Sequence, residues 1–322
     1  MERVKRDIKV AVLAGGTSSE REISLNSGKN AQAALCEAGY EHVDLLDPTQ
    51  DRFLDSIRSG YDVAFLALHG AGGEDGQIQH VLAYLGIPYT GSDAAASVLA
   101  ADKELSKVMY ERAGIPVAAG VALERDEAYD VNAVARVVGE HSFVKPAING
   151  SSYGVSKVDD PSLLGAAIER AFEYGEKVLV EECLVGTEIT VGVYEDGDLR
   201  ALPVVEIRCP EDADFYNLDV KYVDPTDIHR IPAQIDPEDY ARAQELACAA
   251  HRALGCYGLS RSDFIVTDRG PVILETNTLP GMTDTSLYPD EIRHEGMVFS
   301  DVCDALIAGA LARAGRMDAV QA

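Results

Sequence analysis

The chain has 322 residues, of which 47% are hydrophobic and 25% are charged, and its formal net charge is −26. This length suits two or three packed units better than one hydrophobic core. A strongly acidic surface repels nucleic acid and anionic lipid, so we expect neither nucleic acid nor membrane as a partner. Any phosphate-binding site must therefore be locally basic.

The six cysteines are scattered and form no C-x-x-C pair, so zinc and redox motifs of that type are absent from the sequence. Such cysteines are typical of small buried side chains in a reducing compartment. The first apolar run, 8–14, ends in Gly15 and Gly16, which is the pattern of a strand and a turn and not of a signal peptide. No segment of the sequence approaches the roughly 18 apolar residues of a membrane span. We expect a cytoplasmic protein.

Residues 8–90 alternate strand and helix signals, which predicts an open parallel sheet with helices on its faces. The expected strands are 8–13, 42–46 and 62–68, with an extended segment at 87–90, and the expected helices are 24–38 and 78–85. Two glycine-rich loops, 15–22 and 69–76, follow strands in this pattern. Because ligands in parallel sheets usually bind at the carboxyl ends of strands, both loops are candidates for a binding site.

The rest of the chain mixes helices with strands in an α+β order. The expected helices are 93–100, 102–113, 131–139, 161–174, 237–254 and 298–314. The expected strands are 117–123, 142–145, 155–158, 177–183, a hairpin of 189–194 with 199–207, and a pair at 259–267 and 271–276. The proline- and aspartate-rich stretch 209–235 predicts a long, mobile surface loop, and long loops are commonly functional. We expect three domains, at 1–91, 92–184 and 185–322.

Acidic and amide side chains gather on the last predicted strand pair. Asp263 lies on its first strand, and Glu275 and Asn277 lie at the end of its second strand. Because side chains alternate along a strand, Asp263 shares a face with Arg261, and Glu275 shares a face with Asn277. Two carboxylates and an amide oxygen on paired strands suit Mg²⁺. An ordinary hairpin with polar outward side chains is the alternative.

A lysine followed by a Gly/Ser loop is a candidate phosphate site. Lys145 ends a predicted strand, and Gly150-Ser151-Ser152-x-Gly154 follows it. Glycine lets backbone N–H groups approach phosphate oxygens, and hydroxyls and lysine add hydrogen bonds and charge. The loop is not a Walker A motif, because it lacks G-K-[ST]. Taken alone, such a Gly/Ser loop is more often a structural turn.

The order of the motifs is more specific than any one of them. It runs from GGTSSERE at 15–22 and HGAGGEDG at 69–76, through Lys145 and its loop, to RSD at 261–263 and ETNTLPGMT at 275–283. Over about residues 8–314 this set resembles the D-alanine–D-alanine ligase family of the ATP-grasp superfamily. The resemblance implies a three-domain ATP-grasp fold with an N-terminal open parallel α/β domain. ATP would lie between the central and C-terminal domains.

The resemblance also implies a two-step reaction that supplies a peptidoglycan precursor. The carboxylate of one D-alanine attacks the γ-phosphate of ATP, and the amine of a second D-alanine then attacks the resulting acyl phosphate. D-alanyl-D-alanine, ADP and phosphate are the products. The implied cofactor is Mg²⁺, usually as two ions and with Mn²⁺ as a substitute, and the implied assembly is a homodimer.

The same resemblance assigns roles to single residues. Nucleotide binding falls to Lys103, Lys145, Gly150, Ser151, Ser152, Glu181, Glu182, Leu184 and Glu188, with Lys221 near the γ-phosphate. Asp263, Glu275 and Asn277 are the metal ligands. Glu20 and the neighbouring His69 serve the first D-alanine, Ser286 and Leu287 serve the second, and Arg261 and the Gly281 N–H stabilise the oxyanion. Glu20, Ser151 and Tyr222 form a hydrogen-bonded trio that closes the mobile loop over the site.

Several of these residues have plainer explanations. Glu20 could be an acid at a helix N-terminus, favourable against the helix dipole. His69 could be a polar residue at the end of a strand, and Tyr222 could serve only the packing of its loop. Ser262 and Thr276 stand where the family usually has aliphatic residues. Since strand alternation turns them away from the metal ligands, we expect little effect from them.

Two other functions remain open. One is a ligase on the same fold that makes D-alanyl-D-lactate or another dipeptide. Tyr222 favours D-alanine as the second substrate, because relatives that use D-lactate often carry phenylalanine there, whereas His229 on the same loop leaves the preference open. The other is a regulator that binds nucleotide without catalysis, although the presence of Arg261 and of all three metal ligands argues against it.

Overall fold

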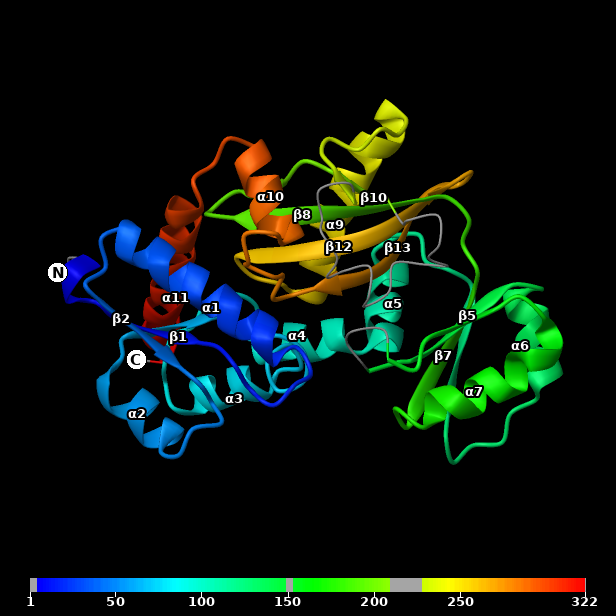
Figure 1. Cartoon of the computed structure of the whole chain (residues 1–322), viewed down its shortest axis with the longest axis horizontal. Helices are drawn as coiled ribbons and strands as arrows, with labels where there is room; N and C mark the ends of the chain where they lie inside the picture. The colour runs from blue at the N-terminus through cyan, green and yellow to red at the C-terminus, as the bar shows by residue number, and fades with distance from the viewer. Residues whose placement is uncertain (1–4, 149–152, 209–227, 322) are drawn as a thin grey trace.

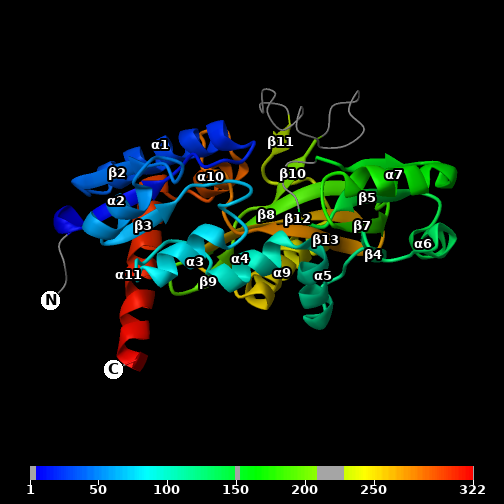
Figure 2. The same cartoon turned by 90° about the horizontal axis from the view of Figure 1, so that it is seen from below.

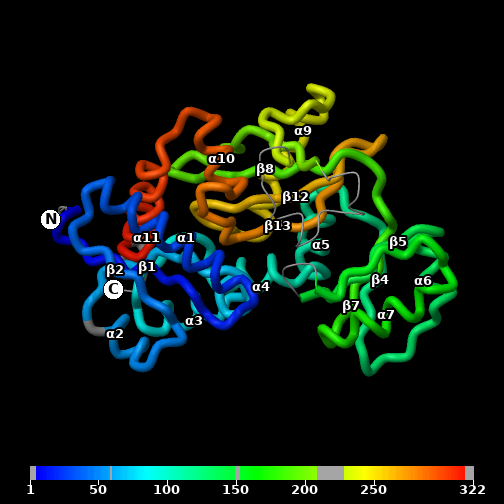
Figure 3. The backbone as a smooth tube through the Cα atoms, viewed as in Figure 1, coloured from blue at the N-terminus to red at the C-terminus, as the bar shows by residue number. Residues whose placement is uncertain are grey.

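The computed structural model in Figure 1 describes residues 5–148, 153–208 and 228–321. A 3-10 turn, η1 (Lys5–Asp7), precedes the first strand. Seen as a tube in Figure 3, the N-terminal part and the sheet that begins at β4 (Gly120–Glu124) and ends at β7 (Lys177–Glu182) lie at opposite ends of the molecule, with the C-terminal sheet between them. None of the helices in the described residues is long and apolar enough to cross a membrane.

The N-terminal part is a parallel sheet with helices on both faces. Its strands are β1 (Lys9–Leu13), β2 (His42–Leu46) and β3 (Val63–Leu66), in the order β2-β1-β3, and its helices are α1 (Arg21–Glu37), α2 (Phe53–Gly60) and α3 (Gln77–Tyr84). Alternate side chains of β1 enter different cores. Val10 and Val12 lie in one core with Ala31 of α1, whereas Leu13 lies in another with Ile57 of α2. The predicted open parallel α/β sheet is therefore confirmed.

The last helix of the chain returns to this N-terminal sheet. α11 (Phe299–Gln321) packs against α1 and β3. Val302 and Leu306 of α11 belong to the same core as Val10 of β1. In Figure 1 the red helix lies beside the blue elements, although they are at opposite ends of the sequence.

The central part is an antiparallel sheet covered by two helices. Its strands are β4 (Gly120–Glu124), β5 (Ser142–Pro146), β6 (Ser156–Val158) and β7 (Lys177–Glu182), in the order β4-β7-β5-β6. The helices are α6 (Val131–Val138) and α7 (Leu164–Phe172), the second preceded by the turn η2 (Pro161–Leu163). Val144, Val178 and Val180 pack with residues of both helices in one core.

The C-terminal part is a larger antiparallel sheet. Its strands are β8 (Thr187–Glu195), β9 (Leu199–Ala201), β10 (Val205–Ile207), β11 (His229–Arg230), β12 (Leu259–Thr267) and β13 (Gly270–Asn277), and its path is β11-β10-β8-β12-β13 with β9 beside β8. Ile189, Val191 and Phe264 share a core with α5 (Lys103–Arg112) and α9 (Pro237–Leu254). Figure 2 shows α4 (Ala94–Ala101), α5 and α9 together along this face. The opposite face carries the polar side chains described below.

Most predicted elements are present, and the differences have local causes. The predicted strand 199–207 is divided into β9 and β10 around Pro203, which has no N–H to give to a ladder. The predicted strand 117–123 begins only at Gly120, because Val117 instead bridges to Ile273 of β13. Two short helices, α2 and α10 (Leu287–His294), were not predicted. Of the predicted loop 209–235, residues 209–227 lie outside the described residues, and His229 and Arg230 form β11.

Candidate active site

The pairing of β12 with β13 brings the predicted metal ligands together. In this antiparallel register Asp263 lies opposite Glu275, and Arg261 lies opposite Asn277. Alternation along the two strands therefore places all four side chains on one face of the sheet. Thr190 of β8 lies opposite Asp263 on the other side and donates a hydrogen bond to Asp263 Oδ1 at 2.5 Å.

Ser262 and Thr276 occupy the opposite, buried face, as strand alternation predicted. Their hydroxyl oxygens are 2.8 Å apart, and the hydroxyl of Tyr110 on α5 donates to Thr276 at 2.8 Å. All three side chains are buried. Since each hydroxyl has a partner, the polar residues at these two positions bury no unsatisfied group.

Basic side chains neutralise the two carboxylates. Arg261 makes a two-pronged contact with Asp263, with Nε at 3.1 Å from Oδ1 and Nη2 at 3.0 Å from Oδ2. Lys103 Nζ lies 3.0 Å from Glu275 Oε2. Burial would lower the pKa of Lys103, but Glu275 and then Glu181 raise it above its usual value. Lys103 thus stays charged beside this acidic face.

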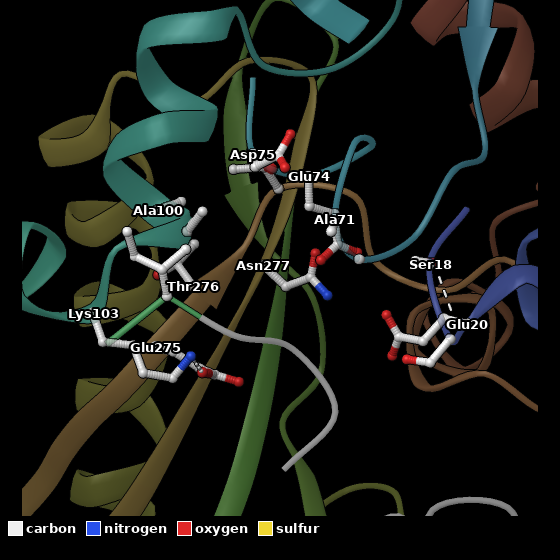
Figure 4. A pocket seen from close by; sticks show the side chains of 15 residues that line it. Ser18, Glu20, Ala71, Glu74, Asp75, Ala100, Lys103, Glu275, Thr276 and Asn277 are labelled. Carbon is white, nitrogen blue, oxygen red and sulfur yellow. Dashed lines mark hydrogen bonds and ion pairs between the residues drawn. The ribbon is translucent and has the colours of Figure 1, made fainter. Parts of the chain in front are cut away.

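A cavity of about 220 Å³ opens over the end of β13. Four predicted site residues line it, and Figure 4 shows Asn277 between the Lys103–Glu275 pair on one side and Glu20 on the other. The lining also includes residues that were not predicted as site residues: Ser18, Ser19, Gly70, Ala71, Glu74, Asp75, Ala100, Ala101, Ile148, Thr276 and Thr278. The cavity therefore joins the glycine-rich N-terminal loops to the acidic strand pair.

Glu20 lies where the first glycine-rich loop meets the second. Its backbone N–H donates to Ser18 Oγ at 3.2 Å, and the Ser18 hydroxyl donates to the His69 carbonyl at 2.6 Å. Gly70 has φ +70°, and a Cβ there would lie 2.8 Å from Glu20 Oε2. Glu20 stands at the N-cap position of α1 without a side-chain capping bond. Its carboxylate thus lines the cavity and does not cap the helix.

His69 has a buried side chain that does not line the cavity. Its Nε2 lies 2.9 Å from Ser27 Oγ, and its Nδ1 lies 3.5 Å from Glu74 Oε1. Ser27 Oγ also accepts the N–H of Met282 at 3.2 Å. His69 is therefore linked through Ser27 to the backbone of Met282. Ser27 in this chain of contacts had no signal in the sequence.

The segment that follows β13 is folded into a tight turn. Ser286 Oγ accepts the N–H of Thr283 at 3.1 Å, and the Ser286 N–H donates to the Thr283 carbonyl at 3.0 Å. A Cβ at Gly281 would lie 2.7 Å from Ser286 Oγ, so only glycine fits without a shift. The Leu287 side chain is buried beside Ile207 and Ile228. Only the backbone of Leu287 can therefore serve a substrate without unpacking this core.

A buried carboxyl group, that of Glu291, contacts the strand residue opposite Arg261. Glu291 of α10 is fully buried, and its Oε1 accepts the N–H of Gly192 at 2.7 Å. Gly192 is the residue of β8 opposite Arg261. The pKa of Glu291 is raised to about 8, mainly by burial and also by the nearby charge of Asp263. The hydrogen bond from Gly192 and the charge of Arg261 act in the opposite direction. This residue was not predicted from the sequence.

The predicted nucleotide-binding lysine Lys145 contacts a shared carboxylate. Glu181 Oε2 lies 2.5 Å from Lys145 Nζ, and Glu181 Oε1 lies 2.5 Å from Lys107 Nζ. Burial would raise the pKa of Glu181, but Lys145 and Lys107 hold it below its usual value. Lys107 was missed, although it lies one helical turn after Lys103 on α5 and therefore on the same face.

The other predicted nucleotide-binding residues are less closely grouped. Glu182 points away from Lys145: its carboxylate contacts Arg269 at 2.9 Å and accepts the N–H of Ala119 at 3.1 Å. Leu184 follows β7, and Glu188 lies on β8 opposite Ile265. Gly150, Ser151, Ser152, Lys221 and Tyr222 lie outside the described residues, so the contacts of the predicted trio with Glu20 are not described. His229 is described, with Nδ1 3.7 Å from Asp290 Oδ2 of α10.

Comparisons with known proteins identify the family of this chain. The family described as D-ala D-ala ligase C-terminus matches residues 109–308, and that described as D-ala D-ala ligase N-terminus matches residues 44–92. The D-alanine–D-alanine ligase of Halalkalibacterium halodurans is 43% identical over 303 residues, which are 93% of this chain and 98% of that protein. D-alanine–D-alanine ligase B of Chromobacterium violaceum is 41% identical over 92% of this chain and 95% of its own length.

Solved structures extend the likeness to three dimensions. The D-alanine–D-alanine ligase from Bacillus anthracis has a TM-score of 0.83 and 31% identity over 96% of this chain and 99% of that chain. A structure of that enzyme complexed with ATP has a TM-score of 0.82, at 30% identity over 96% of this chain and 99% of that chain. The chain belongs to the D-alanine–D-alanine ligase family and has its ATP-grasp fold.

Proposed function

We propose that this chain joins two D-alanine molecules into D-alanyl-D-alanine, with ATP as the energy source and peptidoglycan precursor synthesis as the role. The main support is the cavity in which Glu20 faces Asn277, Glu275 and Lys103. One wall offers a carboxylate for an ammonium group, and the other offers lysine and oxygen ligands for phosphate and its metal ion. The relatives reported above are named D-alanine–D-alanine ligases, and one is solved with ATP.

The charges in the site suit the first step. A substrate carboxylate must approach a triphosphate, and both are anionic, so the reaction needs cations at this point. Lys103 and Lys145 bring such charge into a protein whose formal net charge is −26. Glu20 would hold the ammonium of the first D-alanine and so orient its carboxylate toward the phosphates.

The donor set on β12 and β13 fits Mg²⁺. Two carboxylates directly opposite each other and a nearby amide oxygen are hard oxygen ligands. Asn277 Oδ1 accepts the N–H of Leu279 at 2.8 Å and keeps a second lone pair for an ion. Asp263, Glu275 and Asn277 would hold the metal, which when bound supplies positive charge to the phosphates. Two ions, and Mn²⁺ as a substitute, belong to this proposal.

The second step needs stabilisation of an oxyanion and exclusion of water. Arg261 and the N–H of Gly281 are the proposed donors, and such donors are worth roughly 3–4 kcal/mol each. The turn at Ser286 and the backbone of Leu287 would bind the carboxylate of the second D-alanine. We place loop closure on Ser151 and Tyr222 with Glu20, and γ-phosphate contact on Lys221, by family resemblance. Closure would protect the acyl phosphate from water.

The remaining parts of the proposal rest on the family. We divide the chain into domains at 1–91, 92–184 and 185–322, with the nucleotide between the second and third. Gly150 and Ser152 would bind phosphate oxygens, and Glu182, Leu184 and Glu188 would bind adenine and ribose. A homodimer is the proposed assembly. The cytoplasm is the proposed compartment, because it supplies ATP.

A substrate panel tests the function. ADP release is measured with D-alanine alone, and then with D-lactate or L-amino acids added. Rapid ADP release with D-alanine, together with D-alanyl-D-alanine as the product, is the expected result. No turnover with D-alanine would refute the proposal. A product that contains D-lactate or an L-amino acid would identify a different ligase on this fold.

A further inference from the structure

Lys107 is the most deeply buried lysine of the site in the described residues, and it has no role in the reaction described so far. Its side chain is 9% exposed, and that of its partner Glu181 is 4% exposed. Glu181 divides its two carboxylate oxygens between Lys107 and Lys145, each at 2.5 Å. The three side chains, here called the Glu181 cluster, thus contain two cations and one anion.

Burial of this surplus charge is unfavourable unless an anion accompanies it. Burial lowers the pKa of Lys107 against the attraction of Glu181, and the neighbouring Lys145 lowers it further. Despite the short ion pair, Lys107 Nζ makes no hydrogen bond of regular geometry within the described part of the chain. An apolar residue of similar length would avoid this cost, so a purely structural need does not explain lysine here.

The location of the cluster suggests which anion it serves. Lys107 lies on α5, which packs against β13 and α9, whereas Glu181 and Lys145 lie on β7 and β5 of the central sheet. The cluster therefore lies at the junction between the central sheet and a helix packed on the C-terminal sheet, and the proposed nucleotide site lies between these two sheets. Lys103, one turn earlier on α5, contacts Glu275 of β13.

We propose that Lys107 neutralises Glu181, so that the charge of Lys145 remains available to the phosphates of ATP. Without Lys107, Glu181 and Lys145 cancel each other, and the cluster becomes neutral. With Lys107, one unit of positive charge remains for the nucleotide. Lys107 is in this sense a positioning residue, because it acts through Glu181 and Lys145. The inference rests on the proposed function, in which ATP binds at this junction.

The test is ATP binding by the full chain, measured by titration calorimetry with Mg²⁺ and without D-alanine. Lys107→Met should weaken ATP binding about tenfold or more, which corresponds to about 1.4 kcal/mol. The double variant Lys107→Met/Glu181→Gln removes both charges and restores the surplus on Lys145. Because Glu181 is itself among the expected nucleotide-binding residues, recovery here means an affinity for ATP at least about threefold above that of Lys107→Met.

Lys177→Met is the matched control. Lys177 of β7 contacts Asp102 Oδ2 at 3.1 Å and Glu104 Oε2 at 2.6 Å near the start of α5, so it also joins this helix to the central sheet. Its loss should leave ATP affinity within about twofold, whereas thermal melting shows how much each lysine stabilises the junction.

The outcomes separate the alternatives. Unchanged ATP affinity in Lys107→Met would overturn the inference. Equal weakening in Lys107→Met and Lys177→Met, without recovery in the double variant, would also overturn it and assign both lysines to junction stability. If the unsubstituted chain binds no ATP, the proposed function itself fails. Weakening confined to Lys107→Met, with recovery in the double variant, supports the inference.

Discussion

The buried carboxyl of Glu291 predicts a pH-dependent loss of stability that one substitution should abolish. In the folded protein its pKa is raised from 4.5 to about 8, because the carboxyl is buried and Asp263 and Asp290 lie near it. Between these two pH values the folded state holds a proton that the unfolded state has released. The stability from this proton is fully present below pH 4.5 and is lost as pH rises through about 8.

The size of the effect follows from the same two values. One pKa unit corresponds to about 1.36 kcal/mol, so the full change is on the order of 5 kcal/mol. Between pH 5.5 and 7.5 the free energy of unfolding should fall by roughly 2–3 kcal/mol from this group alone. Glu291→Gln keeps an oxygen for the Gly192 N–H but cannot titrate, so its stability should lack this slope.

Urea unfolding followed by circular dichroism measures the slope in both proteins, with EDTA present and nucleotide absent. All other titrating groups cancel in the difference between the two proteins. We expect the free energy of unfolding of the unsubstituted chain, minus that of Glu291→Gln, to decrease steadily as the pH rises through this interval. A difference that stays constant from pH 5.5 to 7.5 would show that Glu291 is already ionised in the folded protein. That result would refute the reasoning.

Three further predictions concern other parts of the molecule. Glu275→Gln should reduce ADP release at least about a hundredfold while the melting temperature stays close to that of the unsubstituted chain, and retained activity would contradict the metal assignment. Burial lowers the pKa of His251 from 6.5 to about 4, so the unfolded state gains the first proton as pH falls. The free energy of unfolding should therefore fall by about 1.4 kcal/mol for each unit by which the pH decreases between these two values. Urea unfolding of His251→Gln should lack this dependence on pH. Gly281→Ala should lower kcat by about tenfold or more, because its Cβ would lie 2.7 Å from Ser286 Oγ, and an unchanged kcat would contradict the need for glycine at this turn.

Local pattern predicted only part of the acidic face. Strand alternation placed Asp263 with Arg261 and Glu275 with Asn277, but regular pairing from the turn at 268–270 would set Asp263 opposite Leu274. A register shift next to Asp263 sets it opposite Glu275 instead, so that the two pairs share one face. The buried positions of Ser262 and Thr276 followed from the same alternation. The face of each residue on its own strand followed from neighbours in the sequence, whereas the register shift that aligns the two strands did not.

Residues whose role depends on distant packing were not predictable in this way. In the sequence Lys107 is a helix lysine like many that face solvent, and only the approach of β7 to α5 buries it beside Glu181. Glu291 had no signal either, because α10 is short, contains Pro289 and was not predicted as a helix. Its burial depends on β8, about a hundred residues earlier in the chain.

The return of α11 to the N-terminal sheet has a consequence for synthesis on the ribosome. The core that holds Val10 and Val12 of β1 is completed by Met282, Tyr288, Val302 and Leu306. A nascent chain with β1, β2 and β3 already formed would expose part of that apolar face until about residue 310 had emerged. We therefore expect the N-terminal sheet to complete its core last, and chaperones that bind apolar surface to act mainly on this unfinished face during translation.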